Sequence, residues 1–229
     1  MRGSHGFTLL EIAIVLVIIG LLLSGVLKGQ ELITSARVRN LISQQDGVKA
    51  AFFGFEDRYR AVPGDYSQAD SNINCGATAC INGNGNGRIE AGTAGAIHEE
   101  ILAWQHLSAS RFVIDSYTMA NSGVSVPDES NSARNFYSGI FLQLVFDNIW
   151  GPAGNAVSKH HLNTGGLVPV EIIAEVDRKI DDGKPYSGAF QFSPYARAGD
   201  VAPNPATCVS GSDWGISGGD SNCGGASLF

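Results

Sequence analysis

Apolar residues fill the first part of the chain almost without interruption. Between residues 7 and 27 the polar side chains are those of Thr8, Glu11 and Ser24. A helix of this length rises far enough, at about 1.5 Å per residue, to cross a hydrocarbon core of about 30 Å. The pattern therefore predicts a membrane-spanning apolar helix over residues 7–27.

Beyond Lys28 the pattern becomes amphipathic. Apolar residues recur three, four or seven positions apart, which is the spacing of one helix face. The first proline is Pro63, so the helix is predicted to continue to about residue 60. A sheet packed on this face would give the protein its core. The face consists of Val38, Leu41, Val48, Phe52, Phe55 and Tyr59.

The remainder of the chain, residues 61–229, mixes short helical and strand patterns with glycine-rich loops. Pro63-Gly64 predicts a turn that ends the long helix. The predicted fold class is α+β, with a long N-terminal helix packed by an antiparallel-sheet head. Predicted helices cover 97–107 and 169–180, strands cover 111–118, 137–146 and 187–192, and loops cover 70–95 and 121–135.

Charge and cysteine content narrow the class of protein. The net charge is −7 with 15 Lys and Arg, which argues against a nucleic-acid-binding face spread over the head. An even number of cysteines in an exported domain predicts two disulfides. Cys75–Cys80 with Cys208–Cys223 is the simplest of three connectivities, and free or zinc-bound thiols are the alternative.

Three explanations compete for the N-terminus. It could be a secretory signal peptide, a signal anchor held inside by Arg2, or a short leader that ends at Gly6 and is cut before Phe7. Glu11 lies a turn into the apolar run, where a carboxylate costs about 2.5–3.5 kcal/mol and normally marks function. The alternative for Glu11 is a protonated or snorkelling carboxyl near the interface.

Gly6-Phe7-Thr8-Leu9-Leu10-Glu11, followed by an unbroken apolar helix, resembles the prepilin-peptidase site of type IV pilins and type II secretion pseudopilins. Segments 60–65, 99–107 and 177–183 resemble recurring segments of large prepilin-type proteins. The C-terminal disulfide loop resembles the D-region of type IV pilins.

The resemblance implies how the N-terminus is processed. A membrane peptidase would cut after Gly6 and methylate the new amine of Phe7. Glu11 would help align each subunit with the N-terminus of a neighbour, since a buried carboxylate needs a cation. The implied domains are a leader (1–6), a helix (7–60, with 7–27 in the membrane or filament core and 28–60 amphipathic) and an exported head (61–229).

The resemblance also implies a function. The chain would be a structural, non-enzymatic subunit of a type IV pilus or related filament. Its partners would be other copies in a helical filament, the prepilin peptidase and the inner-membrane assembly machinery, with no nucleic acid. It would lie in the bacterial inner membrane before assembly and in an extracellular or periplasmic filament afterwards. Alternatives are a minor or tip pilin, a pseudopilin, and, in another class, a membrane-tethered exported enzyme or binding protein.

One loop carries a candidate metal site, although no cofactor is required. Asn82, Asn84 and Asn86 have the alternating oxygen spacing of an EF-hand-like Ca²⁺ loop, and Glu90 would add charge. The loop lacks aspartate at these positions and has Thr93 where an EF-hand has glutamate. The alternative is a flexible Gly/Asn turn without metal.

Catalytic motifs are lacking in this sequence. His98-Glu99-Glu100 is not HExxH, and there is no GxSxG, P-loop or Rossmann fingerprint. His160-His161 is predicted to be a pair of solvated loop histidines rather than a metal pair. The three tryptophans, Trp104, Trp150 and Trp214, are predicted to be core or rim residues.

Overall fold

The computed structural model describes residues 8–76, 79–92, 96–154 and 157–229. The chain divides into two compact units, with the division between Arg37 and Val38. The long helix α1 (Leu9–Tyr59) contributes to both, because its first part lies in the first unit and its last part in the second. The long N-terminal helix is therefore confirmed.

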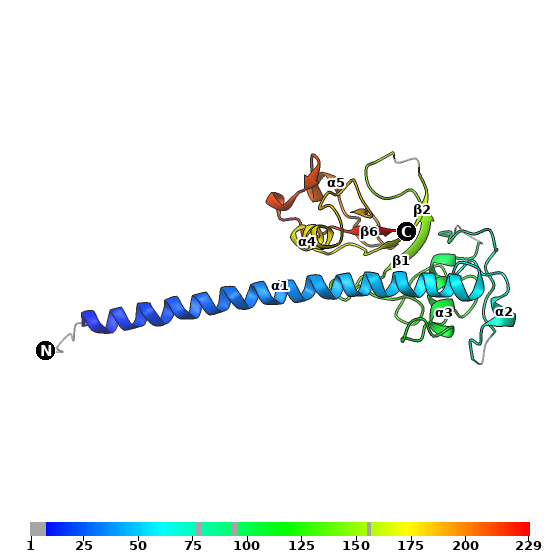
Figure 1. Ribbon diagram of the computed structural model, residues 1–229, viewed down its shortest axis with the longest axis horizontal. Coiled ribbons are helices and arrows are strands. Elements are labelled where there is room, and N and C mark those ends of the chain that lie inside the picture. Colours follow the sequence, from blue (N-terminus) through cyan, green and yellow to red (C-terminus); the bar gives the residue numbers. More distant parts are fainter. Residues whose placement is uncertain (1–7, 77–78, 93–95, 155–156) are drawn as a thin grey trace. The chain divides into compact units, whose positions relative to one another are not determined.

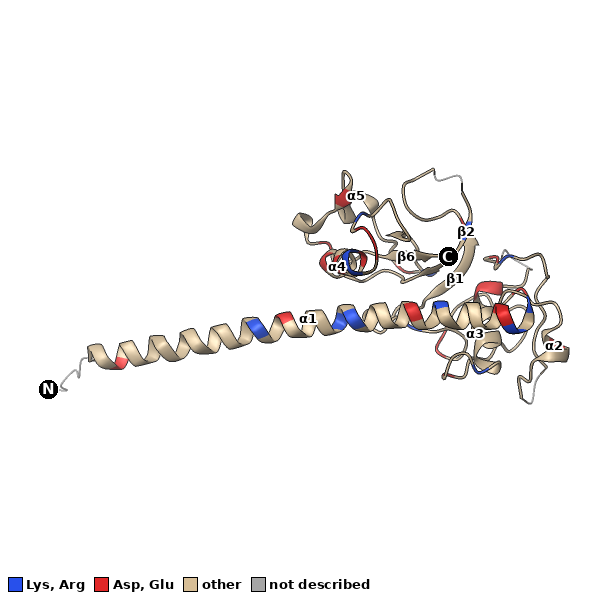
Figure 2. Ribbon diagram, viewed as in Figure 1, with Lys and Arg blue, Asp and Glu red and all other residues tan. Residues whose placement is uncertain are grey.

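The first unit is the apolar part of α1. Its large apolar side chains are exposed on every side, from 46% at Ile19 to 91% at Leu9. Glu11 is the charged residue of this stretch, and Lys28 follows the apolar run (Figure 2). A helix that is apolar all round needs lipid or an apolar partner around it. By length and composition α1 can cross a membrane.

An antiparallel sheet of four strands forms the centre of the second unit, in the order β1-β2-β6-β3 (Figure 1). Its strands are β1 (Gln143–Asp147), β2 (Lys159–Asn163), β3 (Phe190–Phe192) and β6 (Gly225–Leu228). A separate pair joins β4 (Val209–Ser210) to β5 (Asp213–Trp214). The α+β class with an antiparallel sheet is confirmed.

The predicted helices 97–107 and 169–180 are confirmed as α3 (Glu99–Ala109) and α4 (Val170–Ile180). Pro169 takes the cap position of α4, where its missing N–H costs nothing. Gly183, with φ of 75°, turns the chain beyond its end. The short helices are α2 (Ala69–Asn72), α5 (Pro205–Cys208) and the 3₁₀ helix η1 (Ile216–Gly218).

The amphipathic part of α1 supplies the core of the second unit, as its pattern predicted. Val38, Leu41, Val48, Phe52 and Phe55 are buried, and Tyr59 packs partly buried beside them. One cluster packs α1 against α3 and the sheet, and a second packs it against α4 and β3. The α3 and sheet residues of the first cluster include Trp104, Leu107, Leu144 and Leu162; the α4 and β3 residues of the second include Ile173, Val176, Phe190 and Phe192.

The predicted strand at 111–118 is wrong. Arg111 takes a left-handed φ of 64° directly after α3, which turns the chain out of strand geometry. Phe112 then packs on Phe55, while Ile114 is fully exposed and has no sheet neighbour to cover it. The β-branched content of this segment therefore reflects a loop that presents an apolar tip.

The other strand predictions are right in part. The predicted 137–146 strand begins only at Gln143, since Gly139, with φ of 72°, places a turn in its first half. The predicted 187–192 strand is confined to β3. The polar loop at 121–135 is confirmed as irregular structure apart from an isolated bridge between Arg134 and Phe141.

Candidate functional site

The described part of the N-terminus begins with a reciprocal hydrogen-bond pair at the start of α1. Gly6 and Phe7 lie outside the described residues. Glu11 Oε2 accepts bonds from Thr8 N at 2.8 Å and Thr8 Oγ1 at 2.9 Å, and Thr8 Oγ1 accepts one from Glu11 N at 3.2 Å. This is a capping box, which satisfies backbone N–H groups that a helix start leaves unpaired. The Thr8-x-x-Glu11 spacing was the sequence signal for it.

The cysteines of the head form two local disulfides, Cys75–Cys80 and Cys208–Cys223. Cys208 and Cys223 are fully buried. Cys208 ends α5, directly before β4, and Cys223 lies two residues before β6. The second disulfide therefore closes the segment that carries the β4–β5 pair and fixes the approach to a central strand of the sheet.

The Asn/Gly loop brings three of the four candidate metal ligands together. Asn84 Nδ2 and Asn86 Nδ2 both donate to Glu90 Oε2, at 3.1 and 3.0 Å. Asn82 Oδ1 instead accepts a bond from Asp70 N at 2.9 Å. Thr93 lies outside the described residues.

The amide oxygens of this loop already accept backbone bonds. Asn84 Oδ1 accepts from Asn86 N at 3.0 Å, and Asn86 Oδ1 accepts from Arg88 N at 2.9 Å. These are Asx turns, a common way for asparagine to hold a loop. The calcium hypothesis for Asn82, Asn84, Asn86 and Glu90 stays a prediction.

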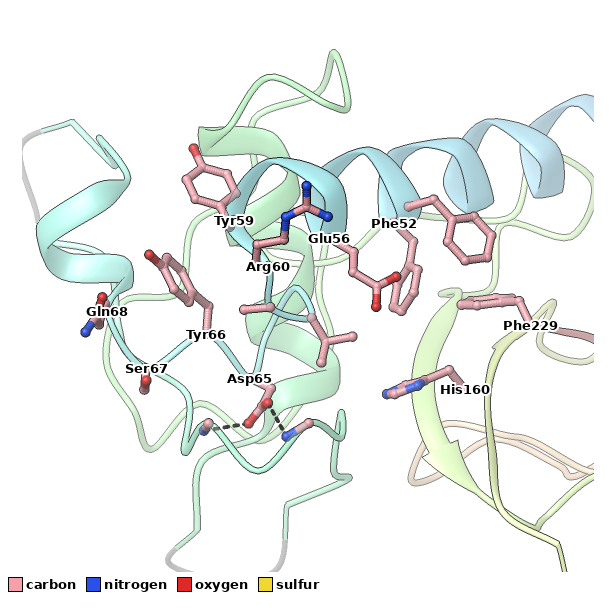
Figure 3. A pocket seen from close by; sticks show the side chains of 15 residues that line it. Phe52, Glu56, Tyr59, Arg60, Asp65, Tyr66, Ser67, Gln68, His160 and Phe229 are labelled. Carbon is pink, nitrogen blue, oxygen red and sulfur yellow. Dashed lines mark hydrogen bonds between the residues drawn. The ribbon is translucent and has the colours of Figure 1, made fainter.

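The backbone of the same loop wraps a buried carboxylate. Asp65, 2% exposed, accepts bonds to Oδ1 from Gly85 N at 2.7 Å and Asn86 N at 2.9 Å, and to Oδ2 from Gly87 N at 2.7 Å (Figure 3). Converging backbone N–H groups are a strong environment for an anion. Sequence reasoning placed Asp65 in the turn after α1 and missed this role.

Glu99 is a second buried carboxylate beneath the loop. It lies in the first turn of α3, is 2% exposed, and accepts bonds from Asn84 N at 3.0 Å and Glu90 N at 3.1 Å. Burial raises the pKa of Glu99 to about 7, the nearby charges of Asp65 and Glu90 raise it further, and the two hydrogen bonds lower it. The carboxyl is therefore partly protonated at neutral pH.

We expect Glu99→Gln to change the pH dependence of stability. The folded protein takes up a proton at Glu99 as the pH falls through about 7, whereas the unfolded chain does so near 4.5. The cost of ionised Glu99 is therefore present above pH 7 and disappears as the pH falls from 7 to 4.5. Relative to the variant, the wild type should gain about 2–3 kcal/mol between pH 8 and pH 5.

Thermal unfolding of the full chain in neutral detergent, followed by circular dichroism, tests this. The wild-type minus E99Q difference in Tm should shift by roughly 5 °C between the two pH values. Burial lowers the pKa values of His106 and His160 to about 4, which destabilises both proteins alike at low pH and cancels in the difference. An unchanged difference would show that Glu99 keeps an ordinary pKa.

A cleft of about 630 Å³ opens between the end of α1, the turn at Asp65 and β2 (Figure 3). His160 Nε2 accepts a bond from Ile89 N at 3.3 Å, and Asp65 is engaged by the loop backbone. Burial first, and the neighbouring His161 second, lower the pKa of His160 to about 4, so its imidazole is neutral at pH 7. Neither group is set up as an acid–base catalyst. The aromatic residues of the lining are Phe52, Phe53, Tyr59, Tyr66 and Phe229.

The prediction that His160 and His161 are solvated loop residues is wrong. Both lie on β2, where neighbouring side chains point to opposite faces of the sheet. The His160 ring packs 5.5 Å from Phe52 and 4.8 Å from Phe146, and His161 is fully buried near Trp150. Opposite faces also prevent the two rings from sharing one metal. The three tryptophans are buried, as predicted.

Comparison with protein families matches residues 1–27 to the prokaryotic N-terminal methylation motif. No curated protein and no solved structure matches the chain. The matched segment holds Gly6, Phe7 and Glu11 together with the apolar start of α1. The motif suggests a structural, non-enzymatic protein and, with the apolar helix, fits one that is anchored in a membrane and then assembled. The chain carries the prepilin-type signal found in type IV pilins and pseudopilins.

Proposed function

We propose that this protein is a subunit of a type IV pilus or a related filament. The peptidase cuts between Gly6 and Phe7 and methylates Phe7, and residues 7–27 anchor the product in the bacterial inner membrane. The assembly machinery then transfers it to an extracellular or periplasmic filament. The observation that carries the proposal is the apolar, all-round exposed helix directly after the methylation motif.

The exposed apolar surface of α1 supports two successive environments. Lipid covers the side chains between Leu9 and Leu27 before assembly, and the same residues of neighbouring copies cover them in the filament. Each fully covered Leu, Ile or Val side chain gains about 1.5–3 kcal/mol relative to water. Helix packing therefore provides the main adhesive surface, and the folded head is carried outside.

Glu11 supports the order of this packing. Cleavage creates a cationic amine at Phe7, and a carboxylate in an apolar environment requires such a partner. Both bonds from Thr8 end on Oε2 of Glu11, so Oε1 can accept a bond from the amine of a neighbouring subunit. The capping box and the contact between subunits are therefore compatible.

Intact mass and N-terminal sequencing of protein from its native envelope or from sheared filaments test the proposal. We expect a chain that begins at Phe7 and carries one added methyl group. A chain that still begins at Met1, in cells that process other prepilins, would refute the proposal and favour a membrane-tethered enzyme or binding protein. Copy number per filament then separates a major subunit from a minor or tip pilin, and absence from surface filaments favours a pseudopilin.

A further inference from the structure

Three carboxylates meet at the C-terminal end of α4, away from the loop discussed above. One oxygen each of Asp177, Asp181 and Asp182 lies within 4.8 Å of the others. Asp177 is on the last turns of α4 and is fully buried, whereas Asp181 and Asp182 follow the helix. Acidic and basic residues gather around this helix in Figure 2.

Asp177 has an oxygen that the described residues leave unsatisfied. Its Oδ2 accepts a bond of 2.7 Å from Trp214 Nε1. Its Oδ1 is buried and has no hydrogen-bond partner among the described residues. A buried carboxylate oxygen without a partner is costly, and the usual remedies are a proton or a cation. This unpaired oxygen, next to two more carboxylates, is the observation that points to a ligand.

The other two carboxylates are held in fixed positions by bonds from the following turn. Asp181 Oδ2 accepts from Ala189 N at 2.5 Å and Phe190 N at 2.8 Å. Asp182 Oδ1 accepts from Lys184 N at 2.8 Å, and its Oδ2 accepts from Ser187 Oγ at 2.6 Å. These bonds leave lone pairs free on both groups and pre-organise them, which lowers the cost of binding.

Nearby lysines neutralise only part of this charge. Lys184 Nζ pairs with Asp213 Oδ1 at 2.5 Å, and its charge also favours ionised Asp182. Lys49 of α1 interacts favourably with Asp181, but burial lowers the pKa of Lys49. For Asp177, burial and the charges of Asp181 and Asp182 raise the pKa to about 6, although Trp214 stabilises the ionised form. The negative end of the α4 dipole adds to the demand for a cation.

We propose that Asp177, Asp181 and Asp182 bind a calcium ion. The donors are all oxygens, which suits a hard cation. Oxygens separated by up to 4.8 Å fit around Ca²⁺, whose bonds are about 2.3–2.6 Å, better than around Mg²⁺, whose bonds are about 2.0–2.1 Å. Bound there, the ion would join the end of α4 to the turn before β3 and, through Asp177, to Trp214 of β5. The proposal does not depend on the filament function.

Thermal unfolding of the full chain in neutral detergent, after chelation and removal of the chelator, tests the site. Exposed carboxylate sites of this kind bind at about 10⁻⁴–10⁻³ M, so 5 mM CaCl₂ should raise Tm by about 3 °C, and 5 mM MgCl₂ by less. Asp177→Asn and Asp182→Asn should each lose the calcium response. Asp182→Asn changes a more accessible residue and serves if the buried variant fails to fold.

Two matched controls locate the response. Glu175→Gln removes a carboxylate of α4 that pairs with Arg178 and Lys179, and it should keep the full calcium shift. Glu90→Gln disables the candidate loop site and should keep it as well. A wild type without a calcium shift, a shift that survives in Asp182→Asn, or a shift lost in Glu90→Gln would each overturn the proposal.

Discussion

Glu11→Gln should abolish filament assembly while the protein is still cut and still anchored. Glutamine can accept the Thr8 N–H bond that Glu11 accepts at 2.8 Å, so the helix start is preserved. It cannot pair as an anion with the Phe7 amine of a neighbour. Leaving a buried charge without its partner costs about 3–5 kcal/mol, which corresponds to at least a hundredfold loss in association.

The measurement is the amount of subunit in sheared filaments relative to the amount in membranes, with the N-terminus sequenced in each fraction. Thr8→Ala is the matched control, because it removes the hydroxyl of the capping box and leaves the Glu11 charge in place. It should cost the helix about 1 kcal/mol and retain assembly. If Glu11→Gln assembles normally and Thr8→Ala does not, Glu11 acts as a helix cap and has no role between subunits.

Replacing Cys208 and Cys223 together by alanine should have the largest effect on the head. In the chain-entropy model, a disulfide across 15 residues contributes about 3 kcal/mol, whereas Cys75–Cys80, across 5 residues, contributes about 2 kcal/mol. Cys208 and Cys223 are also fully buried, so their loss removes packing beside β6. We expect a Tm lower by roughly 6–12 °C.

The Cys75→Ala/Cys80→Ala double variant is the comparison, measured by thermal unfolding in the same detergent. It should unfold at a higher temperature than the Cys208→Ala/Cys223→Ala variant. The reverse order would mean that the segment between Cys208 and Cys223 is held mainly by its own hydrogen bonds and contacts with α4.

Periodicity predicted the helices well because each buries one face or one run of apolar residues. Val38 to Phe55 follow the helical repeat closely, and Pro169 marks the start of α4. The strands β2 and β6 were missed. The histidines of β2 look polar, and β6 is made of small residues because Phe190 lies so close that a Cβ on Gly225 would be 2.2 Å from its ring. Neither composition resembles a typical strand.

The buried carboxylates were harder to predict for a different reason. The partners of Asp65 are backbone N–H groups some twenty residues along the chain, and backbone donors leave no mark in the sequence. Glu99 looked like an ordinary acidic residue in the first turn of a helix. The contacts that bury both of them exist only once the loop has folded over them.

The position of β6 sets the order in which an emerging chain can finish folding. β6 pairs Ser227 with Leu162 of β2 on one side and with Phe190 of β3 on the other. A nascent or translocating chain that has not yet delivered residues 225–228 can form the β1–β2 hairpin, but β3 has no strand beside it. Sheet closure then depends on contacts far apart in sequence, which form slowly. A subunit arrested before that point keeps its apolar core accessible to proteases and chaperones.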